Sequence, residues 1–96
     1  MRKYETMYVL KADLEEEARN KIIEDIHNIL VTNGALNLAP SEWGKRQLAY
    51  PINFEKYGYY VVTNFELEEG SVALKEFTRL LNINPNVLRH IVVNKN

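Results

Sequence analysis

The stretch YGYYVVTNFEL, residues 57–67, limits the fold more than any other part of the sequence. It is dense in aromatic and β-branched residues, which is typical of a β-strand. Apolar side chains occupy both its odd and its even positions, so both faces of the strand are expected to be partly covered. The stretch therefore predicts a strand in the interior of a sheet.

Residues 35–52, which precede this strand, predict a second strand of a different kind. Pro40 has no N–H group to give to a neighbouring strand, and Gly44 indicates a β-bulge. Together they predict a long, bent strand at the edge of the sheet. Residues 53–56 are expected to form a polar connection between the two strands.

A long helix is predicted over residues 14–32 by an apolar stripe at spacings of three and four, which consists of Leu14, Ala18, Ile22, Ile26, Ile29 and Leu30. Asp13 is its expected N-cap, and Glu16 completes a capping-box pattern. Asn33-Gly34 is expected to end the helix, because glycine readily adopts the left-handed conformation of a helix stop.

A second helix is predicted after Ser71, which is the expected N-cap, and before Pro85, which disfavours helix in the residue that precedes it. Its apolar stripe consists of Val72, Leu74, Phe77, Leu81 and Ile83.

Residues 3–10 and 87–93 complete the pattern as strands, so the elements follow the order βαββαβ. With right-handed crossovers, both helices lie on one face of a four-stranded antiparallel sheet. This is the ferredoxin-like arrangement of the α+β class, with the first and third strands central and the second at an edge. A chain of 96 residues suffices for one hydrophobic core, so we expect a single domain over residues 1–96.

The charge balance bears on the class of partner. Twelve Lys and Arg stand against thirteen Asp and Glu, a formal net charge of −1, which argues against a protein that binds nucleic acid strongly on its own. The acids gather in residues 13–25 and 66–76, a pattern that fits either one acidic and one basic side or simply two solvated helix faces. The sequence has no cysteine, which permits a reducing cytoplasm, and its composition predicts neither a signal peptide nor a membrane span.

The sequence contains few residues that could catalyse a reaction. Histidine is the side chain best suited to acid–base catalysis, and the sequence has two: His27 is expected on a helix surface, and His90 in packing or in an RNA contact. No Gly-rich phosphate loop and no metal-ligand spacing occur. Acylphosphatases use this fold with a Gly-rich anion loop after the first strand, but residues 11–14 contain no glycine. We therefore expect no enzyme, no cofactor, no metal and no small-molecule substrate.

The sheet face away from the helices is expected to be an interaction surface. Strand alternation puts a small apolar group on it, consisting of Met7, Val9, Tyr60 and Val62. Residues 56–61 partly match the aromatic signature of RNA recognition motifs, but alternation cannot place two of the aromatics on this face. A protein partner is therefore favoured over a stacked strand of RNA.

Four separated motifs carry a resemblance to a known family. They are WGKRQLAYPI at residues 43–52, MRKYE at 1–5, KYGYY at 56–60 and NVLRH at 86–90. In this order they resemble the bacterial ribosomal small-subunit protein six family over nearly the whole chain. The resemblance implies a structural constituent of the small subunit of the cytoplasmic ribosome. It also implies binding to the central domain of small-subunit rRNA, in a heterodimer with small-subunit protein eighteen.

The resemblance also suggests which residues make these contacts. The expected rRNA-binding residues are Arg2, Lys45, Arg46 and Arg89, and the expected partner-binding residues are Trp43, Tyr50 and Tyr60. For the cations, the alternative is ordinary charge at the edge and ends of a sheet. For the aromatic residues, the alternative is packing in the core.

A second function class stays open beside the ribosomal one. Many ferredoxin-like domains pair through their sheets, and nothing in the composition forbids it. The alternative is therefore a ligand-sensing or homodimerisation module.

Overall fold

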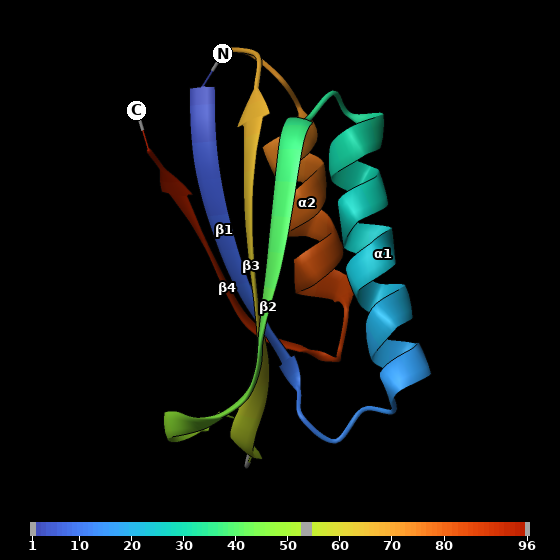
Figure 1. The fold of residues 1–96 in the computed structure, drawn as a ribbon, viewed down its shortest axis with the longest axis vertical. Coiled ribbons are helices and arrows are strands. Elements are labelled where there is room, and N and C mark those ends of the chain that lie inside the picture. The colour runs from blue at the N-terminus through green and yellow to red at the C-terminus, as the bar shows by residue number, and fades with distance from the viewer. Residues whose placement is uncertain (1, 53–54, 96) are drawn as a thin grey trace.

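The computed structural model describes residues 2–52 and 55–95. Six elements follow one another in the predicted order (Figure 1). They are β1 (Arg2–Lys11), α1 (Glu16–Thr32), β2 (Leu36–Ile52), β3 (Glu55–Leu67), α2 (Ala73–Ile83) and β4 (Val87–Asn94). Residues 53 and 54 of the predicted connection lie outside the described part, and residues 55 and 56 already belong to β3.

The four strands form one antiparallel sheet in the order β2-β3-β1-β4. Figure 1 shows both helices on the same side of this sheet. The ferredoxin-like fold of the α+β class is confirmed, with the first and third strands in the centre and the second at an edge. That residues 1–96 make up a single domain stays a prediction.

The hydrophobic core lies between the sheet and the helices. Strand alternation turns Val61 and Phe65 of β3 and Tyr8 of β1 toward the helices, where each is at least 98% buried. From α2, Phe77 meets Tyr8 edge to face, with ring centroids 6.4 Å apart. From α1, Ile26 packs into the same cluster. The predicted inward face of the central strands is therefore confirmed.

The edge strand β2 is bent, as expected. Its pairing with β3 shifts by one residue between Glu42 and Gly44, so Trp43 has no residue opposite it. Gly44 has a φ of +84°, a value that favours glycine, and the predicted bulge is confirmed. A further shift occurs after Leu36, where Asn37 also has a positive φ of +54°. The sequence analysis did not anticipate this second irregularity.

The predicted start of the first helix is wrong. Helix α1 begins at Glu16, two residues later than expected, and its N-cap residue Glu15 makes no side-chain capping bond. Leu14 packs against the core before the helix begins, so Asp13 lies too far upstream to cap the first turn. The predicted stop is confirmed, since Gly34 has a φ of +95° and the next N–H donates to the carbonyl of Leu30 over 2.9 Å.

The second helix agrees with its prediction in the middle and departs from it at the ends. The predicted N-cap is wrong by one residue: Val72 is the N-cap and makes no side-chain capping bond, although the hydroxyl of Ser71 accepts the N–H of Ala73 over 3.1 Å. Phe77 and Leu81 are buried, but Val72 and Ile83 of the predicted stripe are exposed. Val72 precedes the helix and Ile83 is its last residue, so neither faces the sheet. Within the described residues, no helix is long and apolar enough to span a membrane.

Candidate interaction surface

The face of the sheet opposite the helices, here called the open face, carries no helix (Figure 1). Met7 of β1 is paired with Val62 on one side and with Ile91 on the other. One step along, Val9 is paired with Tyr60 and with Arg89. Because paired residues in a sheet project to the same side, an apolar band crosses β3, β1 and β4 on this face. The predicted apolar group is confirmed, and β4 extends it.

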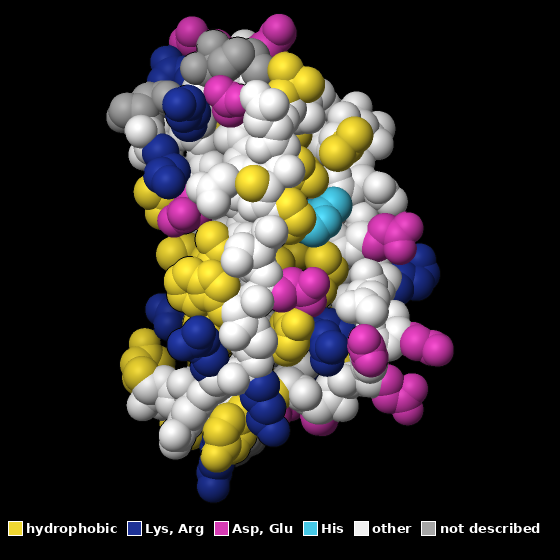
Figure 2. All heavy atoms as spheres, viewed as in Figure 1, with side chains coloured by type: hydrophobic (Ala, Val, Ile, Leu, Met, Phe, Trp, Pro, Cys, Tyr) yellow, Lys and Arg dark blue, Asp and Glu magenta, His cyan; other side chains and the backbone are white. Residues whose placement is uncertain are grey.

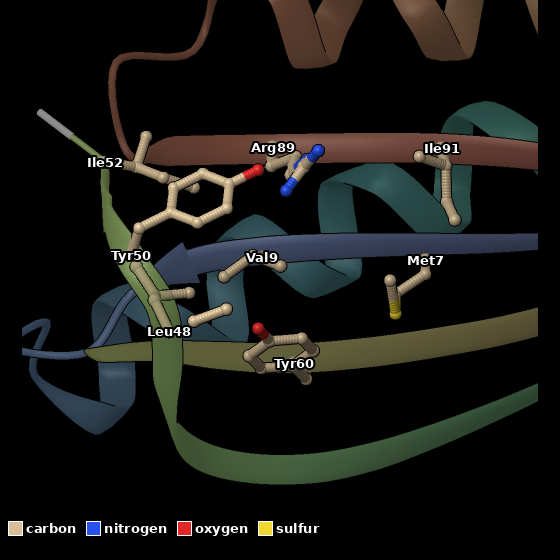
Figure 3. Close-up of a pocket in the computed structure, with 9 residues that line it drawn as sticks. Met7, Val9, Leu48, Tyr50, Ile52, Tyr60, Arg89 and Ile91 are labelled. Carbon is tan, nitrogen blue, oxygen red and sulfur yellow. The ribbon is translucent and has the colours of Figure 1, made fainter. Parts of the chain in front are cut away.

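A hollow of about 200 Å³ opens in this band (Figure 3). Its lining comes from all four strands and consists of Met7, Val9, Leu48, Ala49, Tyr50, Ile52, Tyr60, Arg89 and Ile91. The last residues of β2 bend over the open face, and Figure 3 shows the Tyr50 ring turned toward Arg89. Tyr50 remains 61% exposed and Ile91 44% exposed, so part of the apolar lining of the hollow is still in contact with solvent. The structure thus brings Tyr50, Tyr60 and Arg89 together.

Next to the hollow, β2 carries two cations beside two exposed aromatic rings. The Arg46 guanidinium carbon lies 5.5 Å from the centre of the Trp43 ring, and Lys45 Nζ lies 4.9 Å from the centre of the Tyr57 ring. Both separations allow cation–π attraction. Trp43 is half exposed and lies outside the core, so packing in the core does not explain it.

Arg2 lies apart from the other expected RNA contacts. It begins β1, whereas Lys11 ends β1 and is paired with Gly58, the residue that also pairs with Arg46. Nine residues of extended strand correspond to about 30 Å, so Arg2 is at the opposite end of the sheet from Arg46. Its guanidinium is 3.2 Å from the carboxylate of Glu69 in an ion pair. The four cations expected to contact RNA therefore do not lie together, because Arg2 is far from the other three.

Sequence reasoning missed several residues of this surface. Leu48, Ile52 and Ile91 line the hollow, and the Tyr57 ring makes the cation–π contact with Lys45. For Ile91 a signal was present, since it lies two positions after Arg89 on a strand and so shares its face. Leu48 and Ile52 gave no such signal, because the bend of β2 arises from a pairing shift between Gln47 and Ile52.

Charges are distributed unevenly over the molecule. Figure 2 shows mostly acidic side chains over α1, basic side chains along the lower part of β2, and both kinds near the chain ends. Among the described residues, no carboxylate lies within ion-pair distance of Lys45 or Arg46. This end of the molecule therefore presents uncompensated positive charge, although the chain as a whole carries −1.

A polar cluster lies on the other side of the edge strand, between α1 and the sheet. Tyr59 donates its hydroxyl to Glu42 over 2.7 Å, and this bond is the largest cause that raises the pKa of Tyr59. The Arg19 guanidinium lies 4.2 Å from the centre of the Tyr59 ring. Burial lowers the pKa of His27, against an opposing effect of Glu42. His27 is only partly at the surface, since the residue is half-buried and its Nε2 finds no hydrogen-bond partner among the described residues.

His90 is engaged in packing of the kind expected for it. Its Nε2 lies 2.9 Å from the side-chain oxygen of Asn82 on α2. Within the part of the chain that the structure describes, no three His, Cys, Asp or Glu side chains come together as a metal site.

Fold and surface together define the class of protein: a ferredoxin-like α+β protein with one sheet face left open beside a group of exposed cations and aromatic rings. Comparison with known proteins then gives the family. The family model of ribosomal protein S6 matches residues 3–94, and the chain belongs to this family. The resemblance seen in the sequence motifs is confirmed.

A solved structure agrees with the fold. The chain is similar to the crystal structure of 30S ribosomal protein S6 from Thermotoga maritima, with 24% sequence identity and a TM-score of 0.84. The match covers 98% of this chain and 87% of that one. As a member of the family, the chain is a structural protein of the small subunit of the cytoplasmic ribosome and not an enzyme.

Proposed function

We propose that the protein binds the central domain of small-subunit rRNA jointly with small-subunit protein eighteen, and that the open face together with the adjoining edge strand β2 is its contact surface. One observation carries this proposal: the hollow on the open face brings Tyr50 and Tyr60 together with Arg89, beside the uncompensated cations of β2. An apolar site and a cationic site that adjoin each other suit simultaneous contact with a protein and with RNA.

The protein contact is assigned to the apolar band. Tyr50, Ile91 and Val93 remain exposed on a face that the protein's own helices do not cover. Exposed apolar groups of this kind are stabilised when a partner removes them from water, by about 25 cal/mol for each Å² buried. Tyr50 and Tyr60 are the anchors that we assign to protein eighteen, since aromatic side chains at the centre of an interface contribute most to its affinity.

The RNA contact is assigned to Lys45, Arg46 and Arg89. Phosphate neutralisation provides most of the affinity of RNA-binding proteins, and a chain of net charge −1 offers few cations for it. A basic partner would supply the rest. Arg2 can contribute only if its ion pair with Glu69 opens, and exposed pairs are worth at most about 1 kcal/mol.

A filter-binding titration with the central-domain rRNA at about 0.15 M salt tests the joint binding. We expect the isolated protein to bind weakly, and protein eighteen to raise its affinity by about 5- to 150-fold, a coupling of about 1–3 kcal/mol. The variant Ile91→Ser should lose this coupling, whereas Val72→Ser, which alters another exposed apolar residue away from the open face, should keep it. Tight binding by the isolated protein would contradict joint binding.

The salt dependence of the same titration tests the RNA contacts. Arg46→Ala and Arg89→Ala should each lower the slope of log affinity against log salt by about one unit. Lys21→Ala on α1 removes an equal charge from the acidic side and should leave the slope unchanged. Unchanged slopes in both arginine variants would show that these cations are ordinary surface charge. Assembly into homodimers without binding to the subunit would favour the homodimerisation module instead.

A further inference from the structure

Two aromatic rings and two cations lie close together on β2 and β3. Arg46 is beside the Trp43 ring, and Lys45 is beside the Tyr57 ring. We propose that these two ring–cation pairs form a stacking site for unpaired nucleotides of RNA, with Trp43 and Arg46 as its principal members. The inference rests on the proposed rRNA binding and specifies what this part of the surface recognises. It assigns Trp43 to RNA, in place of the partner contact expected from the sequence.

The backbone explains why the Trp43 ring is presented to solvent. Trp43 is the residue left without an opposite neighbour where the pairing of β2 with β3 shifts. Gly44 follows with a φ of +84°, which bends the strand at this point. The ring is 50% exposed, although tryptophan is the side chain that gains most from burial. A bulge that holds the largest apolar ring outward suits a ligand with a flat, apolar face.

The cations complete the match to a nucleotide. Arg46 lies 5.5 Å from the Trp43 ring centre and Lys45 lies 4.9 Å from the Tyr57 ring centre. No carboxylate among the described residues neutralises either cation. Each pair therefore offers a π-face for a base and a positive charge for a phosphate, the combination found where proteins bind single strands.

The register places one pair on each side of the strand. Lys45 is opposite Tyr59 and Arg46 is opposite Gly58, and consecutive strand residues project to opposite faces. Lys45 shares its face with Tyr57, two positions before Tyr59 along β3. The end of the sheet is thus flanked by a ring on both sides, an arrangement that can hold two splayed bases.

Unpaired nucleotides fit this site better than a duplex does. In a duplex the bases are stacked on each other, and the deep, narrow major groove of A-form RNA is closed to side chains. A ring at a strand edge reaches only a base that has left the stack. A protein is less suited to this site, because each ring here lies beside a cation. The neighbouring hollow is mostly apolar and fits a protein contact better.

Trp43 is the only tryptophan of the chain, so its fluorescence reports directly on the site. We expect a ten-nucleotide single-stranded oligoadenylate at low salt to quench this fluorescence. An RNA duplex with the same number of phosphates should quench it much less at equal occupancy, measured by anisotropy of a labelled RNA. Equal quenching by both would overturn the stacking site.

Variants in the complex of protein, protein eighteen and central-domain rRNA provide the second measurement. Trp43→Leu should lower affinity by about 5- to 150-fold, the loss expected for one stacked base, and leave the salt slope unchanged. Trp43→Phe should keep most of the affinity. Val72→Leu is the control for an exposed apolar substitution elsewhere.

The outcomes separate this inference from the proposed function. If wild type binds the rRNA with its partner and Trp43→Leu binds equally well, the stacking site is wrong and the function stands. If Trp43→Leu weakens the heterodimer in the absence of RNA, Trp43 is a partner contact and the inference is overturned. If oligoadenylate quenches Trp43 but the rRNA does not bind, the stacking site stands and the rRNA assignment is wrong.

Discussion

Both faces of the sheet carry apolar residues, but these residues are buried to different extents. On the helix side, Tyr8 and Val61 are fully buried against α1 and α2. On the open face, Ile91 and Val93 of β4 are each 44% exposed. Two causes separate these rows: the helices cover the first, and the second lies on the edge strand β4, where even Val92 on the helix side is 37% exposed. A row that the chain's own helices do not cover is free to be completed by another molecule.

The open face is itself divided. Val9 is only 2% exposed, and the last residues of β2 bend over this end of the band and bring Leu48 next to it. Beyond that cover, Ile91 stays open. Intramolecular packing therefore provides one wall of the hollow and leaves the other wall to a partner.

The largest expected effect is on the helix side. Phe77→Ala removes a fully buried ring that packs against Tyr8, and we expect it to lower the free energy of unfolding by about 3–5 kcal/mol. Ile91→Ala on the open face should cost less than about 1 kcal/mol in the isolated protein, because the side chain is already exposed. Urea denaturation of both variants provides the measurement. A loss in Ile91→Ala as large as that in Phe77→Ala would mean that the open face is a second core.

A substitution at Gly58 tests how tightly the covered part of the open face is packed. A Cβ at this position would overlap Val9 Cγ1 and lie 3.3 Å from Leu48 Cδ2. Valine is stiff at χ1, so Val9 cannot easily move aside. We expect Gly58→Ala to lower the free energy of unfolding by about 1–3 kcal/mol, the usual cost of overpacking.

The control for this prediction is a double-mutant cycle with Val9→Ala. Removing Cγ1 takes away the obstructing atom, so Gly58→Ala should cost less in the Val9→Ala background than in wild type. If the two costs are equal, the clash with Val9 does not determine the effect.

The elements with a local signal could be predicted from the sequence. The alternation of residues 57–67 gave the central strand and its inward face, and Gly44 gave the bulge. The α1 stripe was less accurate, since Ile23 is buried and Ala18 is exposed. The helix begins two residues late because Leu14 is drawn to the core, a contact that the local capping pattern does not contain.

Features that depend on distant residues could not be predicted. The pair of Arg2 and Glu69 joins positions 67 residues apart, so the sequence alone left Arg2 as a free cation. The bend of β2 over the open face depends on its register with β3, which a one-residue shift changes completely. For this reason, the sequence indicated some of the side chains that form the surface, among them Tyr50, Tyr60 and Arg89, but not which of them meet.

The pH dependence of stability is expected to be a smaller effect, confined to the helix side. Burial lowers the pKa of His27 in the folded protein, while the unfolded chain keeps a value near 6.5. Below about pH 6.5 the unfolded state therefore binds a proton that the folded state resists, so stability falls as pH falls until the folded-state pKa is passed.

His27→Gln should remove this part of the pH dependence. Urea midpoints of wild type and variant at about pH 7.5 and about pH 5.5 measure it, and wild type should lose more stability between the two values. Equal losses in both proteins would mean that His27 is as well solvated in the fold as in the unfolded chain.

The smallest effect on the folded monomer is expected at the edge where the two faces meet. β2 is the outer strand of the sheet and presents unpaired backbone N–H and C=O groups. Charged side chains on an exposed edge disfavour pairing with another chain, and valine favours strand structure. We therefore expect the double variant Lys45→Val, Arg46→Val to keep its fold and yet to form dimers or larger species, while it binds protein eighteen less well.

Analytical ultracentrifugation of wild type and this double variant at matched concentration measures whether the substitutions cause self-association. The matched control is Lys21→Val, Lys75→Val, which removes the same charge and adds the same apolar groups on α1 and α2. Self-association of both variants would attribute the effect to net charge or surface hydrophobicity and not to the edge. If the β2 variant stays monomeric and binds protein eighteen as wild type does, the two cations neither protect the edge nor contribute to the partner contact, which the apolar band of the open face would then provide without them.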